Sequence, residues 1–497
     1  MKSDLYNKLI EYSRSDYYGF HMPGHKRNVT KSDMNNPYSF DITEITGFDN
    51  LHDPEEVILQ EMMKAKQYYG SDISYFLVNG STAGNLSAVS AVAKPGEKII
   101  MARNCHKSVY NVIELRKINV AYIYPKTVKG KQFFGDIDIE ELEQAIKANP
   151  DAKAVFITSP TYEGIVSDVE KIANIAHNNN MALIVDQAHG AHFKMSDCFP
   201  MSAIDCGADV VIESLHKTLP SLTQTAILHY RDYGYVNQKK LEKYLSVYQS
   251  SSPSYVLMSS ICNCIDEMIK NGDKLAVEWT DRIENFKKKV STLKNIEIYS
   301  EKDGYDFDIS KIVICLKENN KADGKWLFDT LRDQFHLEME MKAGNYVLAM
   351  TSAYDTDQGF DRLADALINI DDMLSEREEI HKVRSKREDM IKSQSNYESD
   401  CVKTGLGDIC AIRNKVVCQI HEVSEYDDIN IIQNKIADII NSVENKTYDI
   451  GEKMSDKYVY MYPPGIPLIV PGEIPDKRLL EIIEQYRKDG YEIKEQL

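Results

Sequence analysis

Lys217 lies in a segment that could make its side-chain amine a nucleophile toward an aldehyde. The segment D-V-V-I-E-S-L-H-K-T-L-P places an apolar run directly before Ser214, His216 and Lys217. A lysine among apolar neighbours loses solvation, so its pKa falls and its amine can act as a nucleophile. A solvated surface lysine is the alternative for any single lysine, but this apolar frame favours a catalytic one. Ser214 and His216 could then contact a phosphate group.

A second apolar run ends in an aspartate that could complement this amine. In A-L-I-V-D-Q-A-H-G-A-H-F, the run ends at Asp186 and is followed by Ala188, His189 and Gly190. A carboxylate here could keep a pyridine nitrogen protonated, so that the ring stabilises a carbanion at a substrate's α-carbon. From this segment alone, a helix-capping aspartate or a metal site with His189 and His192 is equally open.

A third segment has the residue types of an anion site. In Y-F-L-V-N-G-S-T-A-G-N, an apolar run leads into Gly80, Ser81 and Thr82 and then into a helical pattern. Free backbone N–H groups and small hydroxyls at a helix N-terminus suit a phosphate ester. The more ordinary interpretation of a Gly-Ser-Thr turn is a helix N-cap without a ligand.

These three segments belong to an alternation of short apolar runs and helical stretches between about residues 55 and 230. Such alternation predicts an α/β domain with a large, mostly parallel sheet covered on both faces. Parallel strands bring their carboxyl ends to one edge, where such sheets bind ligands, so the three segments are expected to meet there. The seven expected strands are Tyr75–Val78, Lys98–Met101, Val120–Tyr124, Ala154–Ile157, Ala182–Val185, Asp209–Ile212 and Thr225–His229.

Four regions are expected along the chain. Residues 1–55 form an N-terminal arm of low apolar content that packs on something else, and 56–285 form the large domain. Residues 286–400 form a smaller α+β domain with spaced strands and a highly charged linker between about 374 and 400. Residues 401–497 form a C-terminal domain, which contains the Pro-rich loop Y-P-P-G-I-P-L-I-V-P-G-E at 462–473.

Composition and charge exclude several classes of protein. The 497 residues contain no apolar run near the roughly 20 residues that cross a bilayer, and the charged N-terminus lacks the pattern of a signal peptide. The net charge of −18 argues against nucleic acid as the main partner. Nine cysteines without a repeated C-x-x-C suit reduced thiols better than disulfides or zinc. We therefore expect a cytoplasmic protein without a metal site.

Several segments resemble the bacterial ornithine/lysine/arginine decarboxylase family, whose fold is of the aspartate aminotransferase type. They are F-H-M-P-G-H-K at 20–26, D-I-T-E-I-T-G-F-D-N-L-H-D-P at 41–54, S-L-H-K-T-L-P-S-L-T-Q-T-A at 214–226 and Y-P-P-G-I-P at 462–467. The resemblance extends over nearly the whole chain, which is most similar to the short, biosynthetic arginine decarboxylases of the family. Three places depart from it: Gln187 stands where the family has an acidic residue, Asn28 stands where it has glycine, and 401–457 matches poorly.

The resemblance implies pyridoxal 5′-phosphate as cofactor. In that case Lys217 binds the cofactor's aldehyde, Asp186 pairs with the pyridine nitrogen, and His106 of R-N-C-H-K-S stacks on the ring. Without the resemblance, His106 would be an ordinary loop histidine. His216 and Lys217 are the candidates for the proton donor at the α-carbon. The full cofactor-binding set comprises Gly80, Ser81, Thr82, His106, Asp186, Ala188, His189, Ser214, His216 and Lys217.

The resemblance also implies decarboxylation of a basic amino acid, with arginine giving agmatine for polyamine synthesis. A cationic side chain needs a carboxylate partner, for which we expect Glu473, with Asp41 and Glu44 contributed by a neighbouring subunit; surface carboxylates are the alternative. A homodimer with its active site at the subunit interface is implied, and further assembly stays open. Lysine or ornithine as substrate, an aminotransferase or lyase of the same fold, and a catalytically silent regulatory homologue are the alternatives.

Overall fold

The structure is a computed structural model. It describes residues 12, 14–26, 37, 40–131, 133–300, 306–317, 322–376, 458–462, 466–470, 477–488 and 492–496. The chain divides into two compact units, Met1–Asp371 with Ser455–Leu497, and Asp372–Met454. Of the second unit, only 372–376 are described, as the end of a helix over 357–376. The elements described below belong to the first unit.

A seven-stranded sheet forms the centre of this unit, in the order β2-β9-β8-β7-β5-β3-β4. Only β9 runs against its neighbours, so the expected mostly parallel α/β sheet is confirmed. All five residues of β7 are buried, as expected of a sheet covered on both faces. The bounds are β2 Ile73–Leu77, β3 Lys98–Ala102, β4 Asn119–Ile123, β5 Ala154–Thr158, β7 Ala182–Asp186, β8 Val210–Glu213 and β9 Ala226–Tyr230.

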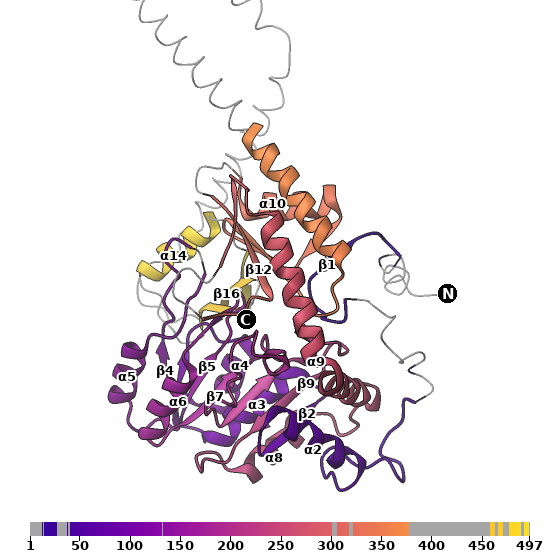
Figure 1. Cartoon of the computed structure of the whole chain (residues 1–497). Coiled ribbons are helices and arrows are strands. Elements are labelled where there is room, and N and C mark those ends of the chain that lie inside the picture. Colours follow the sequence, from indigo (N-terminus) through magenta and orange to yellow (C-terminus); the bar gives the residue numbers. More distant parts are fainter. Residues whose placement is uncertain are drawn as a thin grey trace, which may run out of the picture. The chain divides into compact units, whose positions relative to one another are not determined.

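Helices from the indigo-to-magenta part of the chain surround this sheet (Figure 1). Four of them start where a side chain accepts a hydrogen bond from a backbone N–H of the first turn, at His106, Asp138, Asp168 and Asn237. Such caps satisfy donors that the helix itself leaves free. The helices are α2 Val57–Tyr69, α3 Gly80–Val92, α4 Lys107–Arg116, α5 Ile139–Ala148, α6 Val169–Asn178 and α8 Gln238–Tyr248.

A smaller α+β region follows the 35-residue helix α9, Tyr255–Lys289. Its antiparallel sheet has the order β10-β12-β15-β14, with helix α10 (Gly324–Phe335) beside it. The Trp279 indole of α9 is fully buried and donates to the Thr351 hydroxyl at 2.9 Å, which joins the two regions. The strands are β10 Ile296–Ile298, β12 Lys311–Leu316, β14 Met341–Ala343 and β15 Tyr346–Met350; β11 (Asp306–Phe307) pairs instead with β6 (Ile165–Val166) of the large region.

The N-terminal arm packs on both regions. Strand β1 (Tyr18–Phe20) pairs in parallel with β13 (Leu337–Met339). Further along, the Gly24 N–H donates to the His216 carbonyl at 2.8 Å, at the short helix α7 (Leu215–Thr218). A Cβ atom at Gly24 would lie 2.7 Å from the Thr218 backbone carbon, so only glycine fits this approach. The arm therefore holds the helix that carries Lys217.

A C-terminal sheet packs on the large region. It has the order β17-β16-β18, with bounds Ile466–Ile469, Tyr458–Tyr462 and Glu492–Gln496, and is accompanied by helix α14 (Lys477–Lys488). The buried Arg103 guanidinium donates to the Leu468 carbonyl at 2.9 Å and to the Pro467 carbonyl, and it lies over the Tyr110 and Tyr122 rings. Within the described part of the chain, no helix has the length and hydropathy to cross a membrane.

Candidate active site

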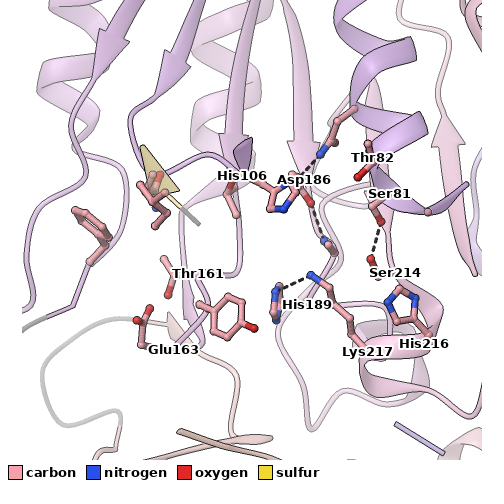
Figure 2. A pocket seen from close by; sticks show the side chains of 18 residues that line it. Ser81, Thr82, His106, Thr161, Glu163, Asp186, His189, Ser214, His216 and Lys217 are labelled. Atoms are coloured by element: carbon pink, nitrogen blue, oxygen red, sulfur yellow. Dashed lines mark hydrogen bonds between the residues drawn. The ribbon is translucent and has the colours of Figure 1, made fainter. Parts of the chain in front are cut away.

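A cavity of about 210 Å³ opens at the carboxyl ends of the sheet strands. Figure 2 shows side chains from several loops turned toward it. The three segments that the sequence expects to meet do meet here, although the Ser81 segment lies about 100 residues before the other two along the chain. All ten residues expected at the cofactor line this one cavity: Gly80, Ser81, Thr82, His106, Asp186, Ala188, His189, Ser214, His216 and Lys217.

Lys217 presents its amine to the cavity and forms no ion pair with the residues that the structure describes. It lies on α7, which begins directly after β8, and its Nζ atom is 2.9 Å from His189 Nε2. Burial lowers the pKa of Lys217, although the charge of Asp186 acts in the opposite direction. Burial also holds the pKa of His189 well below its usual value, so this partner is neutral. A neutral partner and a lowered pKa are what a nucleophilic amine requires.

Asp186 is the last residue of β7 and its carboxylate is held on both oxygens. Oδ2 accepts from the Asn85 amide at 2.9 Å, and Oδ1 accepts from the Ala188 backbone N–H at 3.1 Å. Asn85 is itself fixed, since its amide also donates to the Ser108 hydroxyl at 3.0 Å. The carboxylate is 3% exposed and has a single orientation at the wall of the cavity.

Two histidines at the cavity are neutral at physiological pH. Burial lowers the pKa of both His106 and His216 to about 4. His106 caps α4 by accepting from the Ser108 N–H at 3.2 Å, so its ring is fixed. His216 Nδ1 lies 2.8 Å from the Thr225 carbonyl, and a neutral ring must donate there. A flat, neutral and fixed imidazole such as that of His106 suits stacking on an aromatic ring.

One end of the cavity fits a phosphate. Helix α3 starts at Gly80, which has φ +72°. The side chain of Asn79, the residue before it, accepts no hydrogen bond from the N–H groups of the first turn. The Ser81 and Ser214 hydroxyls are 2.6 Å apart at the same place (Figure 2). Unsatisfied N–H groups with clustered hydroxyls are the donor set of an anion site.

His192 does not take part in this cavity. Its Nε2 lies 3.0 Å from Asp308 Oδ1, and Lys311 Nζ lies 2.8 Å from Asp308 Oδ2; these three fully buried residues are called the Asp308 cluster below. Burial by itself would raise the pKa of Asp308, but His192 and Lys311 outweigh it and lower the pKa. His192 is therefore not available to join Asp186 and His189 in the metal site that the sequence left open.

Eight lining residues were missed by the sequence interpretation. Tyr162 is one of them, with its ring centroid 4.4 Å from that of His189. A usable signal was present, because the segment T-S-P-T-Y-E-G follows the expected strand Ala154–Ile157 and so emerges at the same edge as Asp186. The missed residues are Asn85, Asn104, Phe134, Thr158, Thr161, Tyr162, Glu163 and Ile466.

The three carboxylates expected for the substrate are not brought together here. Glu473 lies outside the described residues. Asp41 and Glu44 are exposed and do not line the cavity of their own chain. Their contribution to the site of a neighbouring subunit stays a prediction.

The fold and the cavity define an enzyme of the aminotransferase-type α/β class. The chain belongs to the Orn/Lys/Arg decarboxylase family, whose major domain matches residues 3–311. An arginine decarboxylase of Bacillus subtilis is 28% identical over 484 residues, which cover 95% of this chain and 91% of that one. YaaO, an uncharacterized protein of B. subtilis, is 38% identical over 304 residues, but the match spans only 60% of this chain and 63% of YaaO.

Solved structures agree in fold. The lysine decarboxylase LdcF of Francisella novicida superposes with a TM-score of 0.68 over 98% of this chain and 78% of LdcF, at 18% identity. The constitutive lysine decarboxylase of Escherichia coli gives 0.64 over 99% of this chain and 80% of its own. At such low identity the likeness shows the fold alone.

Proposed function

We propose that this chain is a pyridoxal phosphate-dependent decarboxylase of a basic L-amino acid, with arginine as the first choice. The observation that carries the proposal is the cavity at the sheet edge, where the Lys217 amine beside neutral His189, a fixed Asp186 carboxylate and a phosphate-type donor set line one space. Membership of the family supports the reaction class. The near full-length match to proteins named arginine decarboxylase supports the substrate.

The lining residues fit the cofactor group by group. The α3 N-terminus with Ser81, Ser214 and His216 would hold its phosphate, and Thr82 extends the same turn. Asp186 would pair with the pyridine nitrogen and His106 would lie on the ring face. When bound, pyridoxal phosphate supplies an aldehyde that captures amines and a protonated ring that accepts the electrons left by departing carbon dioxide.

The chain's own residues then perform three tasks. Lys217 would provide the amine that binds the cofactor's aldehyde, and neutral His189 keeps that amine oriented. Asp186, both of whose oxygens accept hydrogen bonds, would hold the pyridine nitrogen in its protonated form. Lys217 and His216 both line the cavity and are the two candidates for returning a proton to the α-carbon.

We also propose that the enzyme works in the cytoplasm, as a homodimer, in polyamine synthesis. The exposed positions of Asp41 and Glu44 are compatible with a role in a neighbouring subunit's site. The described cysteines are free thiols, which accords with a reducing compartment.

Incubation of the purified, cofactor-loaded protein with arginine, lysine and ornithine in separate reactions tests the proposal. We expect one of the three to yield carbon dioxide and the matching amine, with arginine giving agmatine. Keto acids formed only with an added acceptor would assign an aminotransferase instead. A protein that neither binds pyridoxal phosphate nor turns over any of the three would contradict the proposal.

A further inference from the structure

Glu163 is a carboxylate that the proposed reaction has not yet used. It lines the same cavity as Lys217 and is only 6% exposed. It lies in the loop between β5 and β6, where the Thr161 N–H donates to the Ile165 carbonyl and the Gly164 N–H donates to the Thr161 carbonyl. Gly164 adopts φ +105° and a Cβ there would lie 2.9 Å from the Lys311 side chain, so the turn has little freedom. The position of Glu163 is thus fixed by its backbone.

The carboxylate has no cationic partner among the residues that the structure describes. Burial raises the pKa of Glu163, and the groups acting against burial are the Tyr346 hydroxyl, the Thr161 hydroxyl and its own backbone. The Tyr346 hydroxyl donates to Glu163 Oε1 at 2.7 Å. A buried carboxylate without a positive charge is unfavourable, and an arriving cation would relieve that cost.

The surroundings of Glu163 suit a flexible chain that ends in a charge. Thr161 and Glu163 lie on the opposite side of the cavity from Ser81 and Ser214 (Figure 2). Phe134, Tyr162 and Ile466 supply apolar lining in the same cavity. A molecule held at the phosphate end would therefore share its cavity with this apolar lining and with the Glu163 carboxylate on the opposite side. Aromatic side chains in this lining also favour a cation.

We propose that Glu163 binds the distal cationic group of the substrate and thereby selects basic over neutral amino acids. The inference rests on the proposed function and deepens it, because it assigns the substrate's far end to a residue of the large domain of the same chain. It differs from the sequence expectation, in which Glu473, Asp41 and Glu44 provide the carboxylate.

A structural role is the competing explanation, since Glu163 links the β5–β6 loop to Tyr346 of β15. Two variants separate the explanations. Glu163→Gln removes the negative charge but retains an acceptor for Tyr346. Tyr346→Phe removes the link but retains the carboxylate, and it serves as the matched control.

The test compares kcat/KM for arginine with that for citrulline, whose side chain has the same length but no charge. In Glu163→Gln we expect kcat/KM for arginine to fall about 30-fold or more, mainly through KM, because a hydrogen bond to a charged group is lost. Citrulline should change less than about threefold. Tyr346→Phe should retain most of the discrimination, and Glu163→Asp should recover part of it. Equal losses for both substrates in Glu163→Gln, or a loss of discrimination in Tyr346→Phe, would overturn the inference.

A binding experiment with full-length cofactor-loaded protein separates this inference from the proposed function. Calorimetry with agmatine, a cation that lacks the α-carboxylate, measures the far end of the site without turnover. We expect Glu163→Gln to weaken agmatine binding about 10-fold or more and to leave unchanged the binding of pentylamine, which has the same kind of amine but an uncharged far end. If the wild type decarboxylates no basic amino acid but shows this pattern, only the reaction is wrong. If the wild type decarboxylates arginine but Glu163→Gln binds agmatine as tightly as the wild type does, only this inference fails.

Discussion

The cavity around Lys217 and the Asp308 cluster use the same residue types, lysine, histidine and aspartate, but pair them differently. In the Asp308 cluster, Lys311 and Asp308 are 2.8 Å apart and His192 completes the carboxylate's partners. In the cavity, Lys217 contacts a neutral histidine, and Asp186 is held by Asn85 and Ala188 instead of by the lysine.

The difference shows that the partner of a buried lysine decides whether the lysine has a structural or a reactive role. A buried lysine paired with a carboxylate cannot be removed cheaply, because the carboxylate would remain buried without a cation. Lys217 has a pKa lowered by burial, and its amine contacts a neutral histidine, so the amine stays available. The two sites are in contact, because Lys311 also donates to the His189 carbonyl at 3.3 Å. The ion pair thus supports the backbone of the histidine that faces Lys217.

Substitution of Lys217 gives the largest expected effect, on activity alone. We expect Lys217→Met to lose about 1,000-fold or more in kcat, because the amine that captures the aldehyde is gone. The melting temperature should not fall, since no ion pair among the described residues is lost and a buried amine with a lowered pKa does not stabilise the fold. Turnover and mass spectrometry after borohydride reduction measure this. Retention of a tenth of wild-type activity would contradict the assignment.

Substitution of Lys311 should give the reverse pattern. Lys311→Met leaves Asp308 buried without its cation, and we expect the free energy of unfolding to fall by about 3–5 kcal/mol. Chemical denaturation measures this loss. The double variant Asp308→Asn with Lys311→Met should recover part of it because no unpaired charge remains. A Lys311→Met protein as stable as the wild type would show that the cluster is not a structural ion pair.

A smaller effect is expected from the arm that holds α7. Gly24→Ala places a Cβ within 2.9 Å of the backbone of Thr218 and Leu219, so the arm or α7 must shift. We expect a loss of about 1–3 kcal/mol in stability, as for overpacking elsewhere, together with reduced kcat. Gly47→Ala is the control for removing a glycine, since nothing lies within 4 Å of its Cβ position, although its φ of +88° adds local strain. Equal effects on kcat would argue against a specific role for the Gly24 contact.

The smallest effect concerns pH and the cofactor-free protein. Because the pKa of Lys217 is lowered below its usual 10.5, the unfolded state binds more protons than the folded state in the alkaline range below 10.5. The contribution of Lys217 to stability should therefore improve as pH rises through its folded pKa toward 10.5. The difference in unfolding free energy between wild type and Lys217→Met isolates this slope. A difference that is flat with pH would mean that the pKa of Lys217 is not lowered.

Much of the fold could be predicted from the sequence, because apolar runs and turn residues indicate the strands and helices locally. All seven expected strands of the large sheet occur within a few residues of their expected bounds, and the mostly parallel order follows from the alternation with helices. The cavity-lining positions from Gly80 to Lys217 were also foreseeable, since strand ends of a parallel sheet meet at one edge. Gln187, a departure from the family, donates to buried Glu213 at 2.6 Å and does not line the cavity.

The partners of those residues were not foreseeable, because they depend on side-chain placement across distant elements. Nothing in the sequence distinguishes Asn85 as the donor to Asp186, or Asp308 as the partner of His192 rather than of a metal. Glu163 was missed because a single carboxylate in a turn is usually solvated, and only the cavity shows that this one is buried.

The link between Arg103 and β17 affects when the protein can finish folding during synthesis. The two partners in this buried contact are 364 residues apart, and the same strand supplies Ile466 to the cavity. At roughly 5–20 residues per second, the ribosome needs about 20–70 seconds to make the intervening chain. Throughout that interval the Arg103 guanidinium lacks these carbonyl partners and one wall of the cavity is missing. Firm cofactor capture should therefore come late, once the C-terminal sheet has been translated.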